Sequence, residues 1–461
     1  MKKRQLWLAV SKANLIVPVV AIFLMATPAL AGDPSGVKTY SDTLEGLQFA
    51  INFAWVLLCA FLVFNMQAGF AFLGAGFIRR KNTLNYLTMS YIDFCAGSFT
   101  FWLFGFSLMF GGSQLAPGLV NGNSFVGYSG FLLLGDSYDV QTAVTWLFQM
   151  MFAAAAATIV AGAVAERVKF QAYLIYTFLI TGIVYPLYGH WMWGGGWLSI
   201  LPFGTGAKDF AGSGVVHAIG GLIAFIGAWM VGPRIGKYEN GKPVVIPGHN
   251  LVYVISGTLI LLFGWFGFNA GSTMRVTDLR VSIIALNTFL AATMGALVMI
   301  YYTYFTTGKA DMQMACNGTL AGCVAITASS AYVPPWAAVV IGIIAAFIMR
   351  GCVHFIETTL KVDDPVGAVS VHGANGLWGL LSVGVFADGT YQGVNGLIMG
   401  HVGQLFSQFI AAVTAMAWCF SLGLGIFVFI KYTIGIRATA EAELQGMDVV
   451  EHGTECYPGY R

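Results

Sequence analysis

Two stretches of the chain, Asp209-Phe-Ala-Gly-Ser-Gly-Val-Val-His217 and Asp364-Pro-Val-Gly-Ala-Val-Ser-Val-His372, follow one pattern. Each has an Asp eight residues before a His, a Val directly before that His, and a Gly-rich apolar stretch after it. A chance match of one short pattern is the alternative explanation. Because each stretch also begins a long apolar segment, we interpret the two as equivalent positions of a repeated fold.

The composition around these stretches is that of a membrane protein. Of the 461 residues, 57% are hydrophobic and 9% are charged, whereas a soluble domain carries roughly 25% charged residues. So few charges cannot cover a water-facing surface, and the 58 glycines suit helices that pack closely in lipid. We count about eleven apolar segments that are long enough to cross roughly 30 Å of hydrocarbon. They lie near 47–76, 84–111, 141–165, 171–191, 213–232, 250–270, 281–306, 312–330, 335–356, 367–387 and 403–435.

The distribution of Lys and Arg predicts how these segments are oriented. Residues 1–31 are typical of a cleavable signal peptide, with Lys2-Lys3-Arg4, an apolar run and Ala29-Leu30-Ala31; an uncleaved anchor is the alternative. With the mature N-terminus outside, 13 of the 22 Lys and Arg lie in cytoplasmic loops and 4 in outer ones, as the positive-inside rule requires. We therefore expect a multi-pass domain of the inner membrane over 32–435 and a cytoplasmic tail over 436–461.

In this orientation the two matching stretches face opposite sides of the membrane. Asp209 precedes the fifth span on the outer side, and Asp364 precedes the tenth span on the inner side. The sequence thus predicts an all-α polytopic protein of eleven spans, in which spans 1–5 and 6–10 are inverted repeats and span 11 is added. Inverted repeats are typical of transporters, whose solute site lies near the midplane between the halves. Each Asp is well placed to cap the helix that follows it, and Asp209 is a candidate for supporting an outer cation site.

The candidate functional residues inside the spans are His217 and His372. A single buried His is more often a satisfied core residue, but two at matching positions of inverted repeats approach each other near the axis of the fold. Ionisable side chains within spans usually mark pathways or proton relays. Burial disfavours imidazolium, so we expect a neutral pair in which one ring donates a hydrogen bond to the other. A metal or haem site is the competing interpretation; the seven Cys form no CxxC pair, and we expect neither a metal nor another cofactor.

Five motifs follow one another along the chain: Ala165-Glu-Arg167, Trp193-Gly-Gly-Gly196, Asp209-Phe-Ala-Gly212 leading to His217, Gly264-Trp-Phe-Gly-Phe-Asn-Ala-Gly-Ser272, and Val362-Asp-Asp-Pro365 leading to His372-Gly373. Together they closely resemble the ammonium transporter family, which includes the Rh proteins, and we identify the chain as a bacterial member. The resemblance covers nearly all of the mature chain. It implies eleven spans, a homotrimer and one pore through each protomer.

The resemblance assigns roles to individual aromatic and polar residues. Trp193 and Ser272 match the outer site that recruits ammonium, with Phe152 as one of its walls. Phe152 and Phe268 match two stacked rings that block the pore below this site. Without the resemblance, these aromatic residues would be taken as lipid-facing or core residues, because the chain has 36 Phe and 12 Trp. Gly367 departs from members that carry an acidic residue there, which weakens the analogy at the inner mouth.

The implied function is the transport of ammonium and methylammonium. A bare cation is costly to bring into hydrocarbon-like surroundings, aromatic faces can recruit it, and paired histidines can hydrogen-bond neutral ammonia at a smaller cost. We therefore expect deprotonation near the phenyl rings and passage of ammonia along His217 and His372, which match the family's pore histidines. The released proton follows through these histidines, which makes transport electrogenic. An ammonium sensor with the same fold and a passive gas channel are the alternatives; no paired carboxylates or nucleophile elbow favours an enzyme.

The end of the chain indicates a regulatory role. From about Ile436 it is polar, with Glu441, Glu443, Asp448 and His452, and it resembles the family's tail, which packs under neighbouring protomers; a merely solvated tail is the alternative. A PII-type regulatory protein at the cytoplasmic face is a partner by family analogy. The net charge of +2 argues against nucleic acid as a partner.

Overall fold

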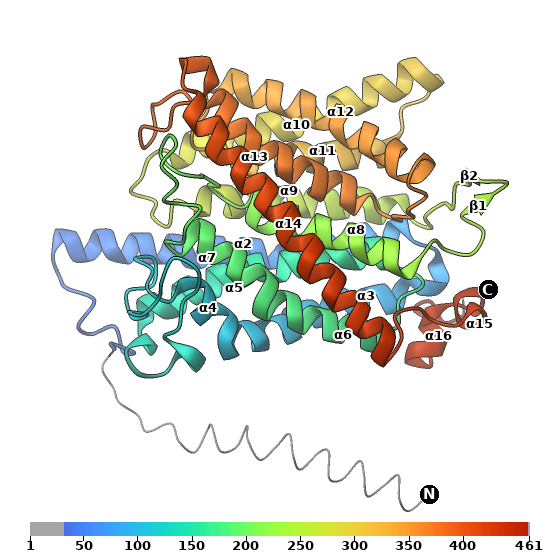
Figure 1. Ribbon diagram of the computed structural model, residues 1–461, viewed down its shortest axis with the longest axis horizontal. Helices are drawn as coiled ribbons and strands as arrows, with labels where there is room; N and C mark the ends of the chain where they lie inside the picture. Colours follow the sequence, from blue (N-terminus) through green and yellow to red (C-terminus); the bar gives the residue numbers. More distant parts are fainter. Residues whose placement is uncertain (1–31, 460–461) are drawn as a thin grey trace, which may run out of the picture.

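Long apolar helices run side by side between the two ends of the molecule (Figure 1). The structure, a computed structural model, describes residues 32–459, so the predicted signal peptide 1–31 lies outside the described residues. Within that range ten helical segments are long and apolar enough to cross a membrane. Helix α11 (Met312–Thr327), with 16 residues, adds an eleventh crossing. The chain is therefore an all-α, multi-pass membrane protein, as the sequence predicts.

The spans match the predicted segments to within a few residues. In chain order the longer helices are α2 (Leu44–Phe77), α3 (Thr83–Thr100) continued by α4 (Phe106–Phe110), α5 (Val140–Val164), α6 (Phe170–Leu179) continued by α7 (Tyr185–Trp193), α8 (Ile219–Val231), α9 (Leu251–Gly271), α10 (Val281–Thr307), α11, α12 (Pro335–Thr358), α13 (Asn375–Phe386) and α14 (Val402–Thr433). The shorter elements include the two-stranded hairpin β1 (Tyr238–Glu239) and β2 (Lys242–Pro243), and α15 (Ala440–Gln445) and α16 (Met447–His452) in the tail.

Helix α11 is short for a membrane span. At 1.5 Å per residue, its 16 residues extend about 24 Å, less than the roughly 30 Å of hydrocarbon. It is nevertheless buried along most of its length, from Leu320 to Thr327, because it packs between α10 and α12 and against α9. Protein rather than lipid therefore surrounds α11, so this helix does not have to match the thickness of the hydrocarbon.

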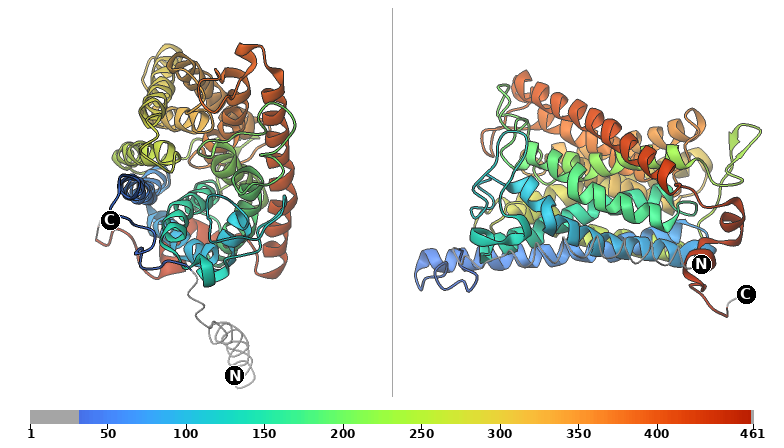
Figure 2. Two further views of the ribbon diagram at one scale, coloured as in Figure 1. Left: turned by 90° about the vertical axis from the view of Figure 1, so that its left-hand side faces the viewer. Right: turned by 60° about the horizontal axis from the view of Figure 1, so that its bottom comes forward.

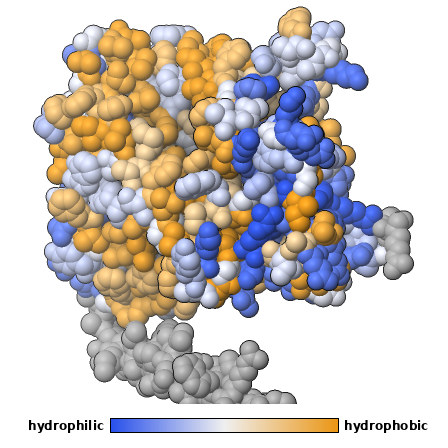
Figure 3. Space-filling model, turned by 45° about the vertical axis from the view of Figure 1, so that its right-hand side comes forward, coloured by the Kyte–Doolittle hydropathy of each residue, from blue (hydrophilic) through white to orange (hydrophobic). Residues whose placement is uncertain are grey.

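The surface separates an apolar side from a polar end. Large hydrophobic side chains such as Phe263, Phe289 and Phe305 are exposed on the flanks of the bundle, and Figure 2 shows α14 lying along its outside. Figure 3 shows polar side chains gathered at the end that carries the β-hairpin and the tail, next to a largely apolar flank. This distribution suits a flank in lipid and an end in water.

The two repeated stretches fold in the same way. A π-helical turn carrying the His, Ser213–Ala218 or Val369–Ala374, leads into α8 and α13 respectively. Gly212 and Gly367, each three residues after the Asp, both have positive φ, at 113° and 81°. The carboxylate of Asp209 accepts from the amides of Gly212, Gly214 and Val215, and that of Asp364 accepts from Gly367 and Val369.

The two helical segments that follow these Asp residues, Ser213–Val231 and Val369–Phe386, are called half-helices here. They run in opposite directions and cross at glycines. Asp209 lies near Trp193, whose Nε1 donates to its backbone oxygen, whereas Asp363, beside Asp364, pairs with Arg234 just after the far end of α8. A Cβ on Gly221, four residues after His217, would lie 2.0 Å from the nitrogen of Gly373, one residue after His372. The same contact occurs with the two halves exchanged: a Cβ on Gly376, four residues after His372, would lie 2.5 Å from the nitrogen of Ala218, one residue after His217. Reciprocal contacts of this kind indicate an approximate two-fold axis between the halves.

Candidate functional site

A row of aromatic rings leads from the outer end of the bundle toward its centre. Phe152 on α5 and Phe268 on α9 stack with centroids 4.0 Å apart and an angle of 23° between the rings. Trp193 meets Phe152 edge-on at 6.1 Å, and His217 stacks on the other side of Phe268 at 5.4 Å. Phe152 and Phe268 are almost completely buried, at 1% and 0% exposed. The two phenyl rings therefore close the path between the half-buried Trp193 and the histidine.

The outer side of this row carries groups that suit a small cation. Trp193 is held in place by its hydrogen bond of 2.6 Å to the backbone oxygen of Asp209, so Asp209 fixes both the start of the half-helix and the indole. Ser272, half-buried and one turn beyond Phe268, donates its hydroxyl hydrogen to the Phe268 carbonyl at 2.8 Å. Because that hydrogen is engaged, the lone pairs of the Ser272 oxygen are left to accept hydrogen bonds.

The two histidines meet at the centre of the row. His217 and His372 face each other with ring centroids 5.1 Å apart, and their Nδ1 atoms lie 3.1 Å apart. Since only one proton can lie between two Nδ1 atoms at this distance, one ring donates and the other accepts. The Nε2 atom of His217 is buried and has no hydrogen-bond partner in the described part of the chain, so it is available to a small solute. None of the rings in the row carries a permanent charge.

The row continues inward through a small cavity to a wider vestibule. The cavity, of about 20 Å³, is lined by His372, Phe70, Tyr86 and Thr158, among others. A volume above roughly 10–15 Å³ holds one water molecule, so the cavity has room for one molecule of that size. A vestibule of about 310 Å³ follows at the polar end and shares Asn317 and Val366 with the cavity as lining residues.

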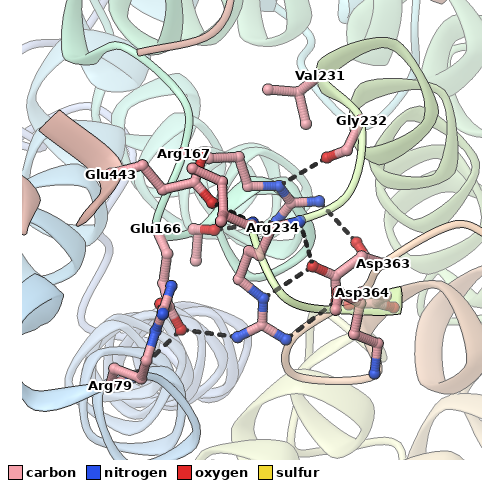
Figure 4. Close-up of polar contacts among 12 residues, drawn as sticks. Arg79, Glu166, Arg167, Val231, Gly232, Arg234, Asp363, Asp364 and Glu443 are labelled. Atoms are coloured by element: carbon pink, nitrogen blue, oxygen red, sulfur yellow. Dashed lines mark hydrogen bonds and ion pairs between the residues drawn. The ribbon is translucent and has the colours of Figure 1, made fainter. Parts of the chain in front are cut away.

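Buried ion pairs fix the polar end next to this vestibule (Figure 4). Arg234 donates to Glu166 at 2.7 Å and to Asp363 at 2.8 Å, and Arg79 also pairs with Glu166. Arg167 donates to the backbone oxygen of Asp363 at 2.6 Å. The side chains of Glu166 and Asp363 are 0% exposed. The cluster holds the segment that carries Asp364, and through Asp364 it positions the half-helix of His372.

Charge governs the ionisation of this cluster. Burial by itself would raise the pKa of Asp363, but the positive charges of Arg167 and Arg234 and the hydrogen bonds from Arg234 outweigh it and hold that pKa well below its usual range. Burial lowers the pKa of Arg167 to about 10, against the opposing effect of Asp363. Asp363 is therefore ionised and Arg167 protonated at neutral pH.

The structure thus brings together most of the residues that the sequence singled out and adds others that it missed. Trp265, one turn before Phe268, stacks on His217 at 5.2 Å, and its Nε1 donates to Thr327. Phe70 faces His372 at 6.2 Å. Trp265 could have been found from the sequence, because it stands in the motif 264–272 at helical spacing from Phe268. Nothing in the sequence distinguishes Phe70 from the other Phe residues, of which the chain has 36 in total.

Known proteins are similar to this chain over most of its length. The model of the Ammonium Transporter Family matches residues 54–457. The chain is 47% identical over 455 residues to "Ammonium transporter Amt2" of Archaeoglobus fulgidus, covering 96% of this chain and 95% of that protein. It is 38% identical over 442 residues to "Ammonium transporter 1 member 3" of Solanum lycopersicum, covering 88% and 93%.

Solved structures show the same fold. One titled "Sensor Amt Protein" superposes with a TM-score of 0.81 at 38% identity, covering 89% of this chain and 100% of that one. Mep2 of Candida albicans superposes with a TM-score of 0.79 at 28% identity, covering 94% and 98%.

Proposed function

Because the chain belongs to the ammonium transporter family, we propose that it carries ammonium across a membrane through a pore in each protomer, and that nitrogen passes the narrow part of the pore as ammonia. The observation that carries this proposal is the uncharged row that runs from Trp193 past Phe152 and Phe268 to the histidine pair. Relatives of the chain are named transporters, and we propose no enzymatic activity.

Recruitment takes place at Trp193, Phe152 and Ser272. An aromatic face attracts a cation by about 0.5–2 kcal/mol, and the Ser272 oxygen accepts one N–H because its own hydrogen is engaged with Phe268. These contacts offset part of the cost of removing water from ammonium. They do not offset the several kcal/mol needed to take a bare charge into the buried row, so the cation stops at the phenyl rings.

Ammonium avoids the cost of bringing a charge into the buried row by losing a proton. Ammonia is neutral, and it passes the stacked rings when they move apart and then hydrogen-bonds to the free Nε2 of His217. The proton follows separately through the hydrogen-bonded pair of His217 and His372, so each cycle moves one positive charge. Potassium has no proton to lose and is rejected by the same row.

The test is an ammonium jump on purified protein in liposomes on a solid-supported membrane, followed by a potassium jump. The wild-type protein is expected to give a current with ammonium and none with potassium. His217→Ala and His372→Ala are expected to abolish or sharply reduce the ammonium current, and His217→Asp or His372→Glu to admit some potassium. Full ammonium current and selectivity in both Ala variants would show that the histidines only pack.

Sensing without transport is the second candidate function. It is favoured by one observation, the 38% identity to the structure titled "Sensor Amt Protein". A sensor keeps the outer site and binds ammonium, so binding without current in the same liposomes would select it. A passive gas channel is disfavoured, because a neutral gas has no use for the cation-attracting Trp193 and Ser272.

We further propose the setting in which this function operates. The pores are arranged as a homotrimer in the inner membrane, with residues 1–31 removed as a signal peptide and the mature N-terminus outside. The tail is cytoplasmic and is the place where a PII-type protein would act. Glu443 in the tail accepts from the amide of Ile235 and from Arg437, both at 2.6 Å, so the tail already touches the loop beside the ion-pair cluster.

A further inference from the structure

A carboxyl group with no place in the mechanism above lies inside the membrane-spanning part of the bundle. Asp93, in the third turn of α3, is 0% exposed. No Lys, Arg or His is among its ion-pair or hydrogen-bond partners in the described part of the chain. An unpaired carboxylate in such surroundings costs far more than a neutral acid, and intramembrane ionisable residues usually serve a function. Asp93 therefore rests as the protonated acid.

Its surroundings are hydroxyl groups from two neighbouring helices, α5 and α6. Tyr173 and Thr177 on α6 donate to the two carboxyl oxygens at 2.6 and 3.0 Å, and the hydroxyl of Thr158 on α5 lies beside the carboxyl group and interacts with it. Among residues 32–459, the titratable groups that interact electrostatically with Asp93 are phenols: Tyr86 on its own helix, and Tyr173 and Tyr176 on α6. Such a setting can hold a proton and pass it on, because each hydroxyl both donates and accepts.

One of these hydroxyls connects Asp93 to the pore. Thr158 lines the cavity of about 20 Å³ that also touches His372. Its hydroxyl donates to the Oε1 atom of Gln67 at 3.0 Å, which leaves the lone pairs of its oxygen able to accept a hydrogen bond from the protonated carboxyl group. Thr177, on the other side of the carboxyl group, does not line the cavity.

We propose that Asp93 is a proton-holding site beside the pore, which exchanges its proton with the cavity below His372 through the hydroxyl of Thr158. Its use in transport rests on the function proposed above. When ammonia reaches the cavity, the Asp93 acid gives up its proton by way of Thr158, and the ammonia becomes ammonium. The carboxylate left behind attracts the proton held as imidazolium by the histidine pair and becomes the neutral acid again. Only O–H and N–H bonds break and form, and no group is oxidised or reduced.

The first test does not depend on transport. Infrared spectra of the wild-type protein in liposomes should contain an absorption band of a protonated carboxylic acid that is missing in Asp93→Asn. In heavy water the band should shift as the acid exchanges its hydrogen. Thr158→Val should slow that exchange, whereas Thr177→Val, the same change at the other hydroxyl, should leave its rate close to that of the wild type. Absence of the band, or equal exchange rates in the two Thr variants, would overturn the proposal even if ammonium current is normal.

The second test measures the current. Asp93→Asn should lower the ammonium current by about a hundredfold, the lower end of what a positioned proton-transfer group contributes, and should change its pH dependence. Thr158→Val should lower the current more than Thr177→Val does, because Thr177 does not line the cavity. The two Thr variants leave the carboxyl group in place, so the comparison of their currents tests the proposal even if Asp93→Asn does not fold. Wild-type current and pH profile in a folded Asp93→Asn would overturn the proposal, whereas a wild-type protein without current would overturn only the transport function.

Discussion

The crossing of the two half-helices makes a sharp prediction for Gly221→Ala. The added Cβ would lie 2.0 Å from the nitrogen and 2.4 Å from the Cα of Gly373. Both atoms belong to the backbone, so no side chain can move aside. To reach an ordinary contact of 3.4 Å, the two half-helices must separate by about 1.4 Å.

The magnitude follows from this separation. Overpacking a core typically costs about 1–3 kcal/mol, and we expect about 3 kcal/mol here because the backbone itself is the obstacle. Gly373 directly follows His372, so the same movement would stretch the 3.1 Å contact between the histidines beyond hydrogen-bonding distance. A misplacement of about 1 Å in a reacting site can cost roughly a hundredfold in rate, and we expect a loss of that order in ammonium current.

Thermal unfolding of the purified protein and the current in liposomes would measure both effects. Gly373→Ala is a graded comparison, because its Cβ would lie 3.1 Å from the nearest atom, and it should be milder in both assays. Gly351→Ala on α12 is the matched control, since nothing lies within 4 Å of its Cβ and Ala favours a helix by about 1 kcal/mol. Wild-type stability and current in Gly221→Ala would refute the close crossing.

Three further predictions concern the outer site, the ion-pair cluster and the topology. Trp193→Leu and Ser272→Ala should each raise the ammonium concentration for half-maximal current, by roughly two- to thirtyfold for a lost contact of about 0.5–2 kcal/mol; unchanged values in both would exclude a recruitment role. Because the folded-state pKa of Asp363 lies below its ordinary value of 3.8, its contribution to stability is complete above that value and is lost as the pH falls further. The melting temperature of the wild type should therefore drop in acid more steeply than that of Asp363→Asn. A reporter fused after Arg461 should be cytoplasmic and one in loop 388–400 external, and the opposite result would contradict the inverted repeat.

The fold was largely predictable because membrane spans depend on composition. A continuous apolar segment of sufficient length has few alternatives to a helix in lipid, so the eleven segments were placed to within a few residues. The eighth segment was predicted to reach residue 330, but α11 ends at Thr327 and a turn follows. Apolar residues of this turn, such as Ala331 and Val333, are buried against neighbouring helices. Hydropathy alone cannot distinguish such a buried turn from the end of a span.

Without the family resemblance, the site was predictable only where a residue type is rare. His217 and His372 are two of seven His, and their matching positions set them apart from the others. Phe70 belongs to an abundant residue type and Trp265 was marked only by its spacing from Phe268, so their three-dimensional contacts were needed to place them beside the histidines. Asp93 escaped notice for a different reason: no second residue shares its pattern, and its partners Tyr173 and Thr177 stand about eighty residues away.

The meeting of the two histidines follows from the crossing itself. Gly221 stands four residues after His217 and three after Ala218, so it lies on the same side of the helix as each of them. The equivalent side of the other half-helix carries Gly376 and Gly373, at the same distances from His372. Gly221 contacts Gly373 and Gly376 contacts Ala218, and the axis between the halves exchanges these two contacts. His217 and His372 occupy equivalent positions beside the contacts and therefore lie next to the axis. Any pair of side chains placed eight residues after the two Asp residues would therefore meet, and the small residues around them determine how closely.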